Sequence, residues 1–427
     1  QRQMCIRDSC IFVYIVKKEE DIMKKFNKVL SVVVASAMVM AMAGCGNTDN
    51  GSAATGTNAA TESAAADNGA ASGSVFKIGG IGPTTGGAAV YGLAVQHGAE
   101  IAVEEINAAG GINGYQVEFK FQDDEADAEK SVNAYNALKD WGAQVLDGST
   151  TSGACIAVTD KTKEDNMFQI TPSGSAVECV QYDNNFRVCF SDPNQGLASA
   201  QYIGENGLAE KIAVIYDSSD VYSSGIYEKF VKEAENQPFE VVAAEAFTAD
   251  NKTDFSVQLQ KAKDAGADMV FLPIYYQESA LILTQAAAMG YAPKWFSCDG
   301  MDGILGGVDN FDVSLTEGVM LLTPFAADAT DDLTQSFVTK YKEKYGETPN
   351  QFAADSYDAI YVIKAAIEKS GVTPDMSVSD ICDGMKAAMT EITVDGLTGN
   401  GMTWTADGEA NKAPKAVVIE NGAYKAM

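Results

Sequence analysis

The chain holds few residues that could carry out covalent chemistry. Its 427 residues include a single histidine, His97, which lies inside a predicted helix. A Ser-His-Asp or Cys-His arrangement would depend on that residue, which we interpret as a surface or partly buried helix position. The acidic run 123–125 could attract a cation, but it stands at the end of a predicted strand and we interpret it as solvated. The sequence therefore predicts neither an enzyme nor a metal site.

A glycine-rich segment invites comparison with a nucleotide-binding loop. Residues 80–86 follow a predicted strand and approximate a G-x-G-x-x-x-G pattern. Pro83 interrupts the pattern, and no acid stands about 20 residues further on in the expected second-strand position, since Asp123 is roughly twice as far away. We interpret these glycines as residues that allow the loop to turn tightly, and we expect no bound cofactor.

Cysteines are spaced without a zinc-binding pattern. After Cys45 come Cys155, Cys179, Cys189, Cys298 and Cys382, and none of them forms a C-x-x-C pair. Cys179 and Cys189 flank a short loop-like segment and could pair as a hairpin disulfide. The alternative, that both cysteines are free thiols, stays open because free buried cysteines are common in folded proteins.

The N-terminal region predicts export. Residues 1–22 do not resemble natural protein, and we treat them as a spurious extension. Met23 is followed by a basic stretch and then by the apolar run 29–43, which has the length of a signal peptide and is short for a membrane span. We therefore predict a signal peptide over residues 23–44.

The end of that apolar run carries a lipidation signal. Met42-Ala43-Gly44-Cys45 resembles the lipobox of bacterial lipoproteins, in which the cysteine is acylated. An ordinary signal peptide with a chance cysteine is the alternative. Residues 45–74 are almost wholly small and polar, which predicts a flexible tether between anchor and folded body.

The charge balance excludes two classes of partner. Residues 1–44 hold seven Lys or Arg and four Asp or Glu, so their removal leaves 23 basic against 55 acidic residues. Such a chain is repelled by nucleic acid and by anionic headgroups.

From residue 75 onward, short apolar runs alternate with amphipathic stretches. Strands are predicted at 75–81, 115–121, 144–146 and 167–170, and helices at 91–109 and 127–141. The rhythm restarts after a pause near 191–196. Strands are then predicted at 211–216, 240–245, 269–272, 295–297 and 318–323, with helices at 222–236, around 255–262 and at 277–289. Two long helices follow, the second with Ile360, Ile363 and Ile367 on one face, and then short strands over 393–420.

This alternation predicts an α/β fold with parallel sheets covered on both faces. Two series separated by a pause predict two doubly wound lobes with a cleft between them.

A set of motifs in order carries a family resemblance. The motifs are FKIG at 76–79, GPTTGGAAVYG at 82–92, GAEIAVEEINAAGGING at 98–114, Asp123-Asp124, TPSGS at 171–175, Phe186-Arg187 and DPNQG at 192–196. In this order they resemble the leucine/isoleucine/valine-binding proteins of ABC importers, which have the type I periplasmic-binding-protein fold. The likeness covers about 350 residues, from Val75 to near the C-terminus.

The resemblance implies where a ligand would bind. Thr151, before a helix predicted to start at about Ser152, falls where the family holds the α-carboxylate of an amino acid. Ser173, Gly174 and Ser175 fall where a backbone carbonyl and a hydroxyl complete the main-chain contacts. Asp299 falls where the second lobe supplies the acid that pairs with the α-ammonium. The family more often has Glu there, so the reach of Asp299 is one methylene shorter.

The resemblance also implies the surroundings of the ligand side chain. Tyr91, Tyr222 and Tyr275 fall around it and are expected to close over it. Ser149 and Thr150 replace residues that are apolar in branched-chain binders. If these two line the pocket, a smaller or more polar amino acid, or a related amide, would fit better than leucine.

The resemblance implies three hinge segments, near 191–194, 323–325 and 397–399. They divide the chain into one lobe of residues 75–193 and 325–398 and another of residues 194–324 and 399–427. The expected protein is a lipid-anchored monomer outside the cytoplasmic membrane that delivers an amino acid to the permease subunits of an ABC importer. A ligand sensor of the same fold is the main alternative, although such sensors usually continue into a transmembrane helix and a cytoplasmic module.

Overall fold

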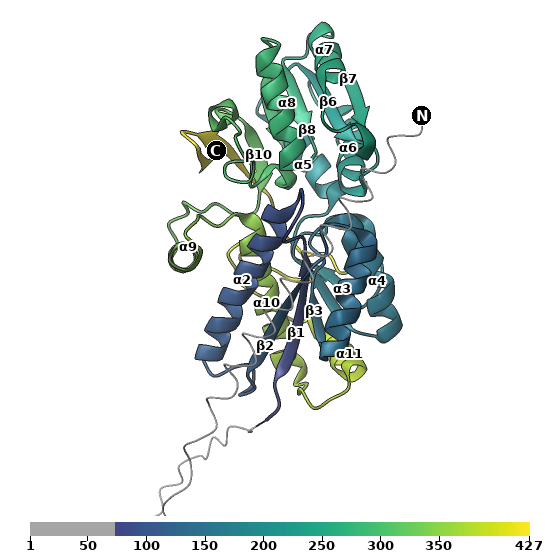
Figure 1. The fold of residues 1–427 in the computed structure, drawn as a ribbon, viewed down its shortest axis with the longest axis vertical. Helices are drawn as coiled ribbons and strands as arrows, with labels where there is room; N and C mark the ends of the chain where they lie inside the picture. The colour runs from purple at the N-terminus through teal and green to yellow at the C-terminus, as the bar shows by residue number, and fades with distance from the viewer. Residues whose placement is uncertain (1–72) are drawn as a thin grey trace, which may run out of the picture. The chain divides into compact units, whose positions relative to one another are not determined.

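The computed structural model describes residues 73–427. The predicted extension, signal peptide, Cys45 and nearly all of the tether lie outside the described residues. Figure 1 shows two groups of helices and strands, one labelled around β1 and the other around β8.

The first lobe is built on a five-stranded sheet in the order β2-β1-β3-β4-β5. Its strands are all parallel and comprise β1 (Phe76–Gly82), β2 (Val117–Asp123), β3 (Val145–Asp147), β4 (Phe168–Thr171) and β5 (Asn185–Arg187). Four of the five had been predicted from sequence, and the three-residue β5 had not.

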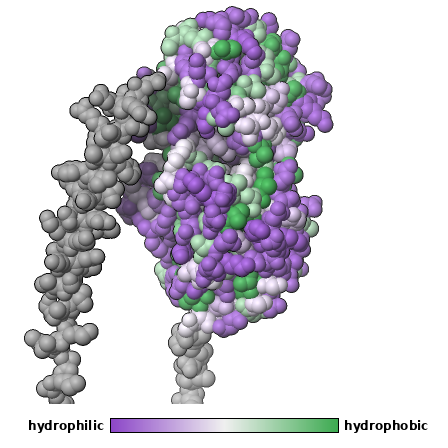
Figure 2. All heavy atoms as spheres, turned by 45° about the vertical axis from the view of Figure 1, so that its right-hand side comes forward, coloured by the Kyte–Doolittle hydropathy of each residue, from purple (hydrophilic) through white to green (hydrophobic). Residues whose placement is uncertain are grey.

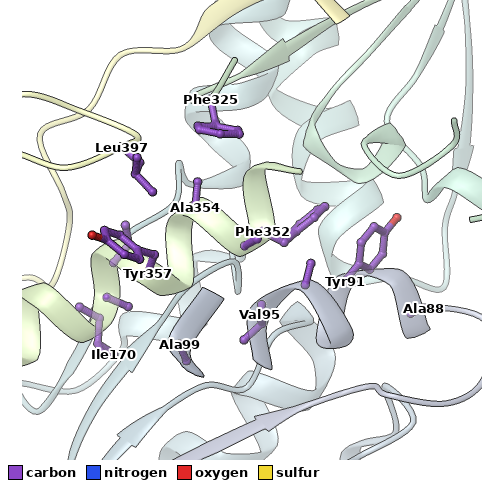
Figure 3. Packing of buried hydrophobic residues seen from close by; sticks show 14 of the residues in the cluster. Ala88, Tyr91, Val95, Ala99, Ile170, Phe325, Phe352, Ala354, Tyr357 and Leu397 are labelled. Carbon is purple, nitrogen blue, oxygen red and sulfur yellow. The ribbon is translucent and has the colours of Figure 1, made fainter. Parts of the chain in front are cut away.

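Helices cover both faces of this sheet, as a parallel sheet requires. One face packs on α2 (Ala89–Ala108) and α10 (Gln351–Ser370), and the other on α3 (Ala128–Trp141) and α4 (Ser152–Asp165). Helix α2 ends just before Gly110 and Gly111, whose φ values of 105° and 84° no longer permit helix. Figure 3 shows α2 and α10 meeting through Tyr91 and Phe352, whose ring centroids lie 4.5 Å apart.

Helix α10 confirms the apolar stripe seen in the sequence. Ile360, Ile363 and Ile367 are all fully buried. Helix α9 (Asp332–Tyr345) precedes it, as predicted, and a further helix, α11 (Val378–Met389), follows it without having been predicted.

The second lobe is built on a seven-stranded sheet in the order β12-β11-β10-β9-β8-β6-β7. Its strands are β6 (Lys211–Asp217), β7 (Glu240–Phe247), β8 (Met269–Leu272), β9 (Lys294–Ser297), β10 (Met320–Thr323), β11 (Lys415–Glu420) and β12 (Ala423–Ala426). The first five are parallel, whereas β11 and β12 add an antiparallel edge.

Helices again cover both faces of the second sheet. Helices α5 (Asp192–Glu205) and α6 (Val221–Ala234) pack on one face, and α7 (Ser256–Asp264) and α8 (Tyr276–Ala288) on the other. This confirms the predicted two-lobed α/β fold.

Two sequence expectations about the connections change. The pause at 191–196 is the start of α5, with Pro193 in its first turn, where a missing N–H costs little. Residues after 399 do not leave the first lobe at once, because Arg187 N donates to Gly408 O and Trp404 Nε1 donates to Arg187 O. We therefore place the third connection at 411–414, later than the predicted 397–399.

The surface agrees with the acidic, polar composition. The face drawn in Figure 2 is mainly hydrophilic, with hydrophobic residues in small separate patches. Among the helices of residues 73–427, none combines the length and apolar character that a membrane crossing needs.

Candidate functional site

A cavity lies where the two lobes meet. Its walls come from both lobes: Tyr91, Thr150, Thr151, Ser152, Ser173 and Phe352 from the first, and Tyr222, Tyr275, Asp299 and Gly300 from the second. Seven of these ten had been chosen from sequence. Ser152 and Gly300 directly follow predicted residues in the chain, whereas Phe352 belongs to α10 and only folding brings it to the cavity.

The first-lobe wall is the start of α4. This helix follows β3 through a short loop, and Thr151 occupies its N-cap position without making a side-chain cap hydrogen bond. Thr151 Oγ1 is buried and has no hydrogen-bond partner among the described residues. Backbone N–H groups at a helix start and an unused hydroxyl together make a site for an anion such as a carboxylate.

The loop after β4 supports that wall from behind. Ser173 lines the cavity and donates its hydroxyl to Thr150 O at 2.5 Å. Gly174 and Ser175, also predicted as ligand contacts, are not among the lining residues. Their carbonyl oxygens instead accept hydrogen bonds from the buried Arg187 guanidinium, which holds the loop in place.

Ser149 does not line the cavity, in contrast to the expectation that it would. Its hydroxyl pairs with that of Ser131 at 2.6 Å, away from the cavity. Thr150 does line it, and its hydroxyl donates to Ile81 O at 3.2 Å. Of the two residues expected to make the pocket polar, Thr150 alone reaches it.

The second-lobe wall is centred on the Asp299 carboxyl group. Asp299 follows β9 and is 5 % exposed. Its Oδ1 accepts a hydrogen bond from Tyr222 Oη at 2.7 Å, and its Oδ2 accepts one from Gln195 Nε2 at 3.0 Å. Burial raises the pKa of Asp299 to about 7, although the Tyr222 hydrogen bond opposes that rise.

A second carboxyl group near Asp299 was missed by the sequence reasoning. Asp192, at the start of α5, is 1 % exposed, and neither of its side-chain oxygens has a hydrogen-bond partner among the described residues. Burial raises its pKa well above the ordinary value, and the charge of Asp299 adds to that rise. Asp192 begins the DPNQG motif that contributes to the family resemblance, but the resemblance assigned no function to this residue.

Aromatic rings close the remaining walls. Tyr222 and Tyr275 stack with centroids 5.1 Å apart, and Tyr91 meets Tyr275 edge-on at 5.4 Å. Tyr91 Oη donates to Gly300 O of the second lobe and accepts from Tyr276 N at 3.2 Å. These rings can exclude water from a small solute held between the lobes.

The suggested Cys179–Cys189 disulfide is not formed. Both thiols are free and buried, as are the other three cysteines of the described residues. Cys179 instead packs in a small cluster with Cys155 and donates to Ser152 O at 3.7 Å. This packing against α4 engages Cys179, so its thiol is not available to Cys189.

Residues outside the cavity account for the remaining chemical candidates. His97 is partly buried in α2, as expected, and stacks on Tyr345 with centroids 3.7 Å apart. Asp124 is fully buried, contrary to the expectation of a solvated run, because its side chain accepts from Ala126 N in the turn after β2. No group of three or more potential metal ligands occurs among residues 73–427.

The chain matches the periplasmic binding protein family over residues 75–423 and belongs to it. Members of this family are extracytoplasmic binding proteins for solutes.

Curated relatives support the same placement. The chain is 31 % identical over 300 residues to Leu/Ile/Val-binding protein homolog 3 of Brucella melitensis, covering 70 % of this chain and 80 % of that protein. It is 30 % identical over 303 residues to a leucine-, isoleucine-, valine-, threonine- and alanine-binding protein of Pseudomonas aeruginosa, covering 69 % and 79 %.

Solved structures agree. The substrate-binding protein LivJ of Streptococcus pneumoniae, in complex with isoleucine, matches with a TM-score of 0.74 and 28 % identity, covering 83 % of this chain and 99 % of that one. The leucine-binding protein LivK of Thermotoga maritima matches with a TM-score of 0.73 and 27 % identity, covering 83 % and 98 %.

Proposed function

We propose that this protein captures a free amino acid and delivers it to an ABC importer, without chemistry of its own. The observation that carries the proposal is the pairing of complementary groups across one cavity. On one side stand the unused Thr151 hydroxyl and the open start of α4, and on the other stands the buried Asp299 carboxyl. A zwitterion leaving water needs both, because its carboxylate requires donors and its ammonium requires an acid.

Binding begins at the first lobe in this mechanism. The α-carboxylate is held by Thr151 and the first N–H groups of α4. Rotation about the three connections then brings Asp299 onto the ammonium, with Asp192 adding a second carboxyl nearby. The importer recognises the protein with its lobes closed, so that closure couples capture to delivery.

The cavity favours a small or polar ligand by the residues that line it. Its lining contains no Leu, Ile, Val or Met, whereas Thr150 and three tyrosines contribute hydroxyl groups. The ligand is a branched-chain or similar small amino acid, with a related amide or small polar metabolite as the alternative.

The protein works outside the cytoplasmic membrane, held as a monomer by a lipid on Cys45. Support for the anchor comes from the lipobox-like sequence and the small, polar residues that follow it.

A melting-temperature screen against the twenty amino acids tests the proposal. A ligand at about 1,000 times its Kd stabilises the folded state by about 4 kcal/mol, which raises Tm by several degrees. Asp299→Ala should cost about 3–5 kcal/mol of binding energy, because it leaves the ammonium buried and unpaired. Asp309→Ala removes an exposed acid of the same lobe and should leave the Tm shift intact. The proposal fails if short amides raise Tm and no amino acid does.

A further inference from the structure

A short segment of the second lobe makes several hydrogen bonds to the first lobe. It comprises residues 299–302, directly after β9 and Cys298. Gly300 O accepts from Tyr91 Oη of α2, and Asp299 O accepts from Gln351 Nε2 of α10 at 3.1 Å. The Asp302 carboxylate adds a third bond, because its Oδ2 accepts from Gln351 N at 3.0 Å.

The third bond, from Gln351 N to Asp302, lies at the start of a helix, because Gln351 is the first residue of α10. The first N–H groups of a helix have no partner within the helix. Asn350 serves one of them, since its Oδ1 accepts from Ala353 N at 3.2 Å. The Gln351 N–H is served by Asp302, so α10 of the first lobe is capped in part by a carboxylate of the second.

The surroundings make this bond favourable only while the lobes meet. The positive end of the 20-residue α10 attracts a negative charge. Asp302 is 4 % exposed, and its Oδ1 has no hydrogen-bond partner among the described residues. If the lobes separated, the Asp302 carboxylate and the Gln351 N–H would each bond to water instead of to each other. The stabilisation from the cap would then be lost.

We propose that Asp302 is a cross-lobe latch, a positioning residue that favours the closed arrangement by capping α10. Asp302 does not line the cavity, so it acts on the ligand only through the fraction of molecules with closed lobes. When the binding-competent state is partly populated, the apparent Kd equals the intrinsic Kd divided by that fraction. The latch therefore sets affinity from outside the ligand site, which goes beyond the function proposed above.

Single-molecule energy transfer between the lobes tests the latch directly. Dyes are attached through p-acetylphenylalanine at Glu129 in α3 and Val257 in α7, which are both exposed. Asp302→Ala should shift the distribution measured without added amino acid towards longer distances. It should also raise the apparent Kd for L-leucine about 2- to 30-fold, the range expected for loss of an N-cap.

Two further variants separate a latch from a merely structural residue. Asp302→Asn keeps an oxygen that can cap the helix and should restore the distance distribution towards that of the unmodified protein. Asp331→Ala removes a carboxylate that caps α9 within its own lobe, where Asp331 Oδ1 accepts from Thr334 N at 2.9 Å. This control should lower Tm and leave the distribution unchanged.

The proposal is overturned if Asp302→Ala keeps the original distance distribution, whether or not its Tm falls. A lower Tm alone would mean that Asp302 only stabilises the second lobe. The distance measurement needs no ligand, so failure of L-leucine to bind would count against the proposed function and not against the latch.

Discussion

The Asp299 carboxyl group is held by neutral partners. Tyr222 and Gln195 donate hydrogen bonds to it, but neither carries a positive charge that would neutralise it. Asp192 and Asp355 are close enough for their charges to act on the site. The ammonium of an amino acid would supply the missing positive charge, which is why binding and proton release should be linked at this residue.

Binding should weaken in acid for that reason. Burial raises the pKa of Asp299 to about 7, so that the carboxyl is increasingly protonated below pH 7. The ammonium requires the ionised form, and the apparent Kd should rise by up to about tenfold for each pH unit below 7. Calorimetry in buffers of different ionisation enthalpy should detect proton release on binding near pH 6. Asp299→Asn should bind weakly and show neither effect, whereas an unchanged pH profile would place the titrating group elsewhere.

At the scale of elements, the end of β1 and the loop after β3 approach each other unusually closely. A Cβ atom added at Gly82 would lie 2.1 Å from Thr150 Oγ1. Glycine at the end of β1 therefore lets the loop that carries Thr150 and Thr151 lie against the strand. The glycines of residues 80–86 had been interpreted as turn formers, and at Gly82 the requirement is space.

Replacement of Gly82 by alanine should therefore destabilise the first lobe. Displacement of Thr150 should lower the free energy of unfolding by about 1–3 kcal/mol, as other overpacking changes do. Gly153→Ala is the matched control, since a Cβ there meets no atom within 4 Å and lies in α4. Alanine in a helix is favoured by up to about 1 kcal/mol over glycine, so this variant should be as stable or more stable. Equal urea midpoints for the two variants would contradict the close-approach argument.

At the scale of the whole molecule, the connections between the lobes are held by buried polar groups. Lys412 Nζ lies 2.6 Å from Asp355 Oδ1, and both side chains are at most 3 % exposed. Lys412 Nζ also donates to Val188 O at 3.1 Å, which ties the third connection to the first. The lobes would therefore rotate about connecting segments that are fixed to one another.

The proposed anchor can be tested in cells. Cys45→Ser should release the protein into the soluble fraction, because it removes the residue proposed to be acylated. Immunoblotting of membrane and soluble fractions measures the result, and Cys382→Ser, which changes a buried cysteine of α11, is the control. Retention of Cys45→Ser in the membrane fraction would contradict a lipid anchor.

Local patterns in the sequence determined the fold class and most of the elements. Strand and helix periodicity reflects burial on one face, and the periodicity placed β1, β6 and β8 within a few residues of their observed bounds. The family resemblance that the motifs carry also pointed to Thr151, Asp299 and the three tyrosines, which line one cavity in the structure.

Tertiary structure alone decided which side chains face the cavity. Ser149 and Thr150 are adjacent in the chain, yet one pairs with Ser131 and the other lines the cavity. Phe352 arrives from α10, about 200 residues further on, and Asp302 meets Gln351 across the two lobes. Such contacts depend on how separately folded lobes meet, and no local periodicity records that geometry.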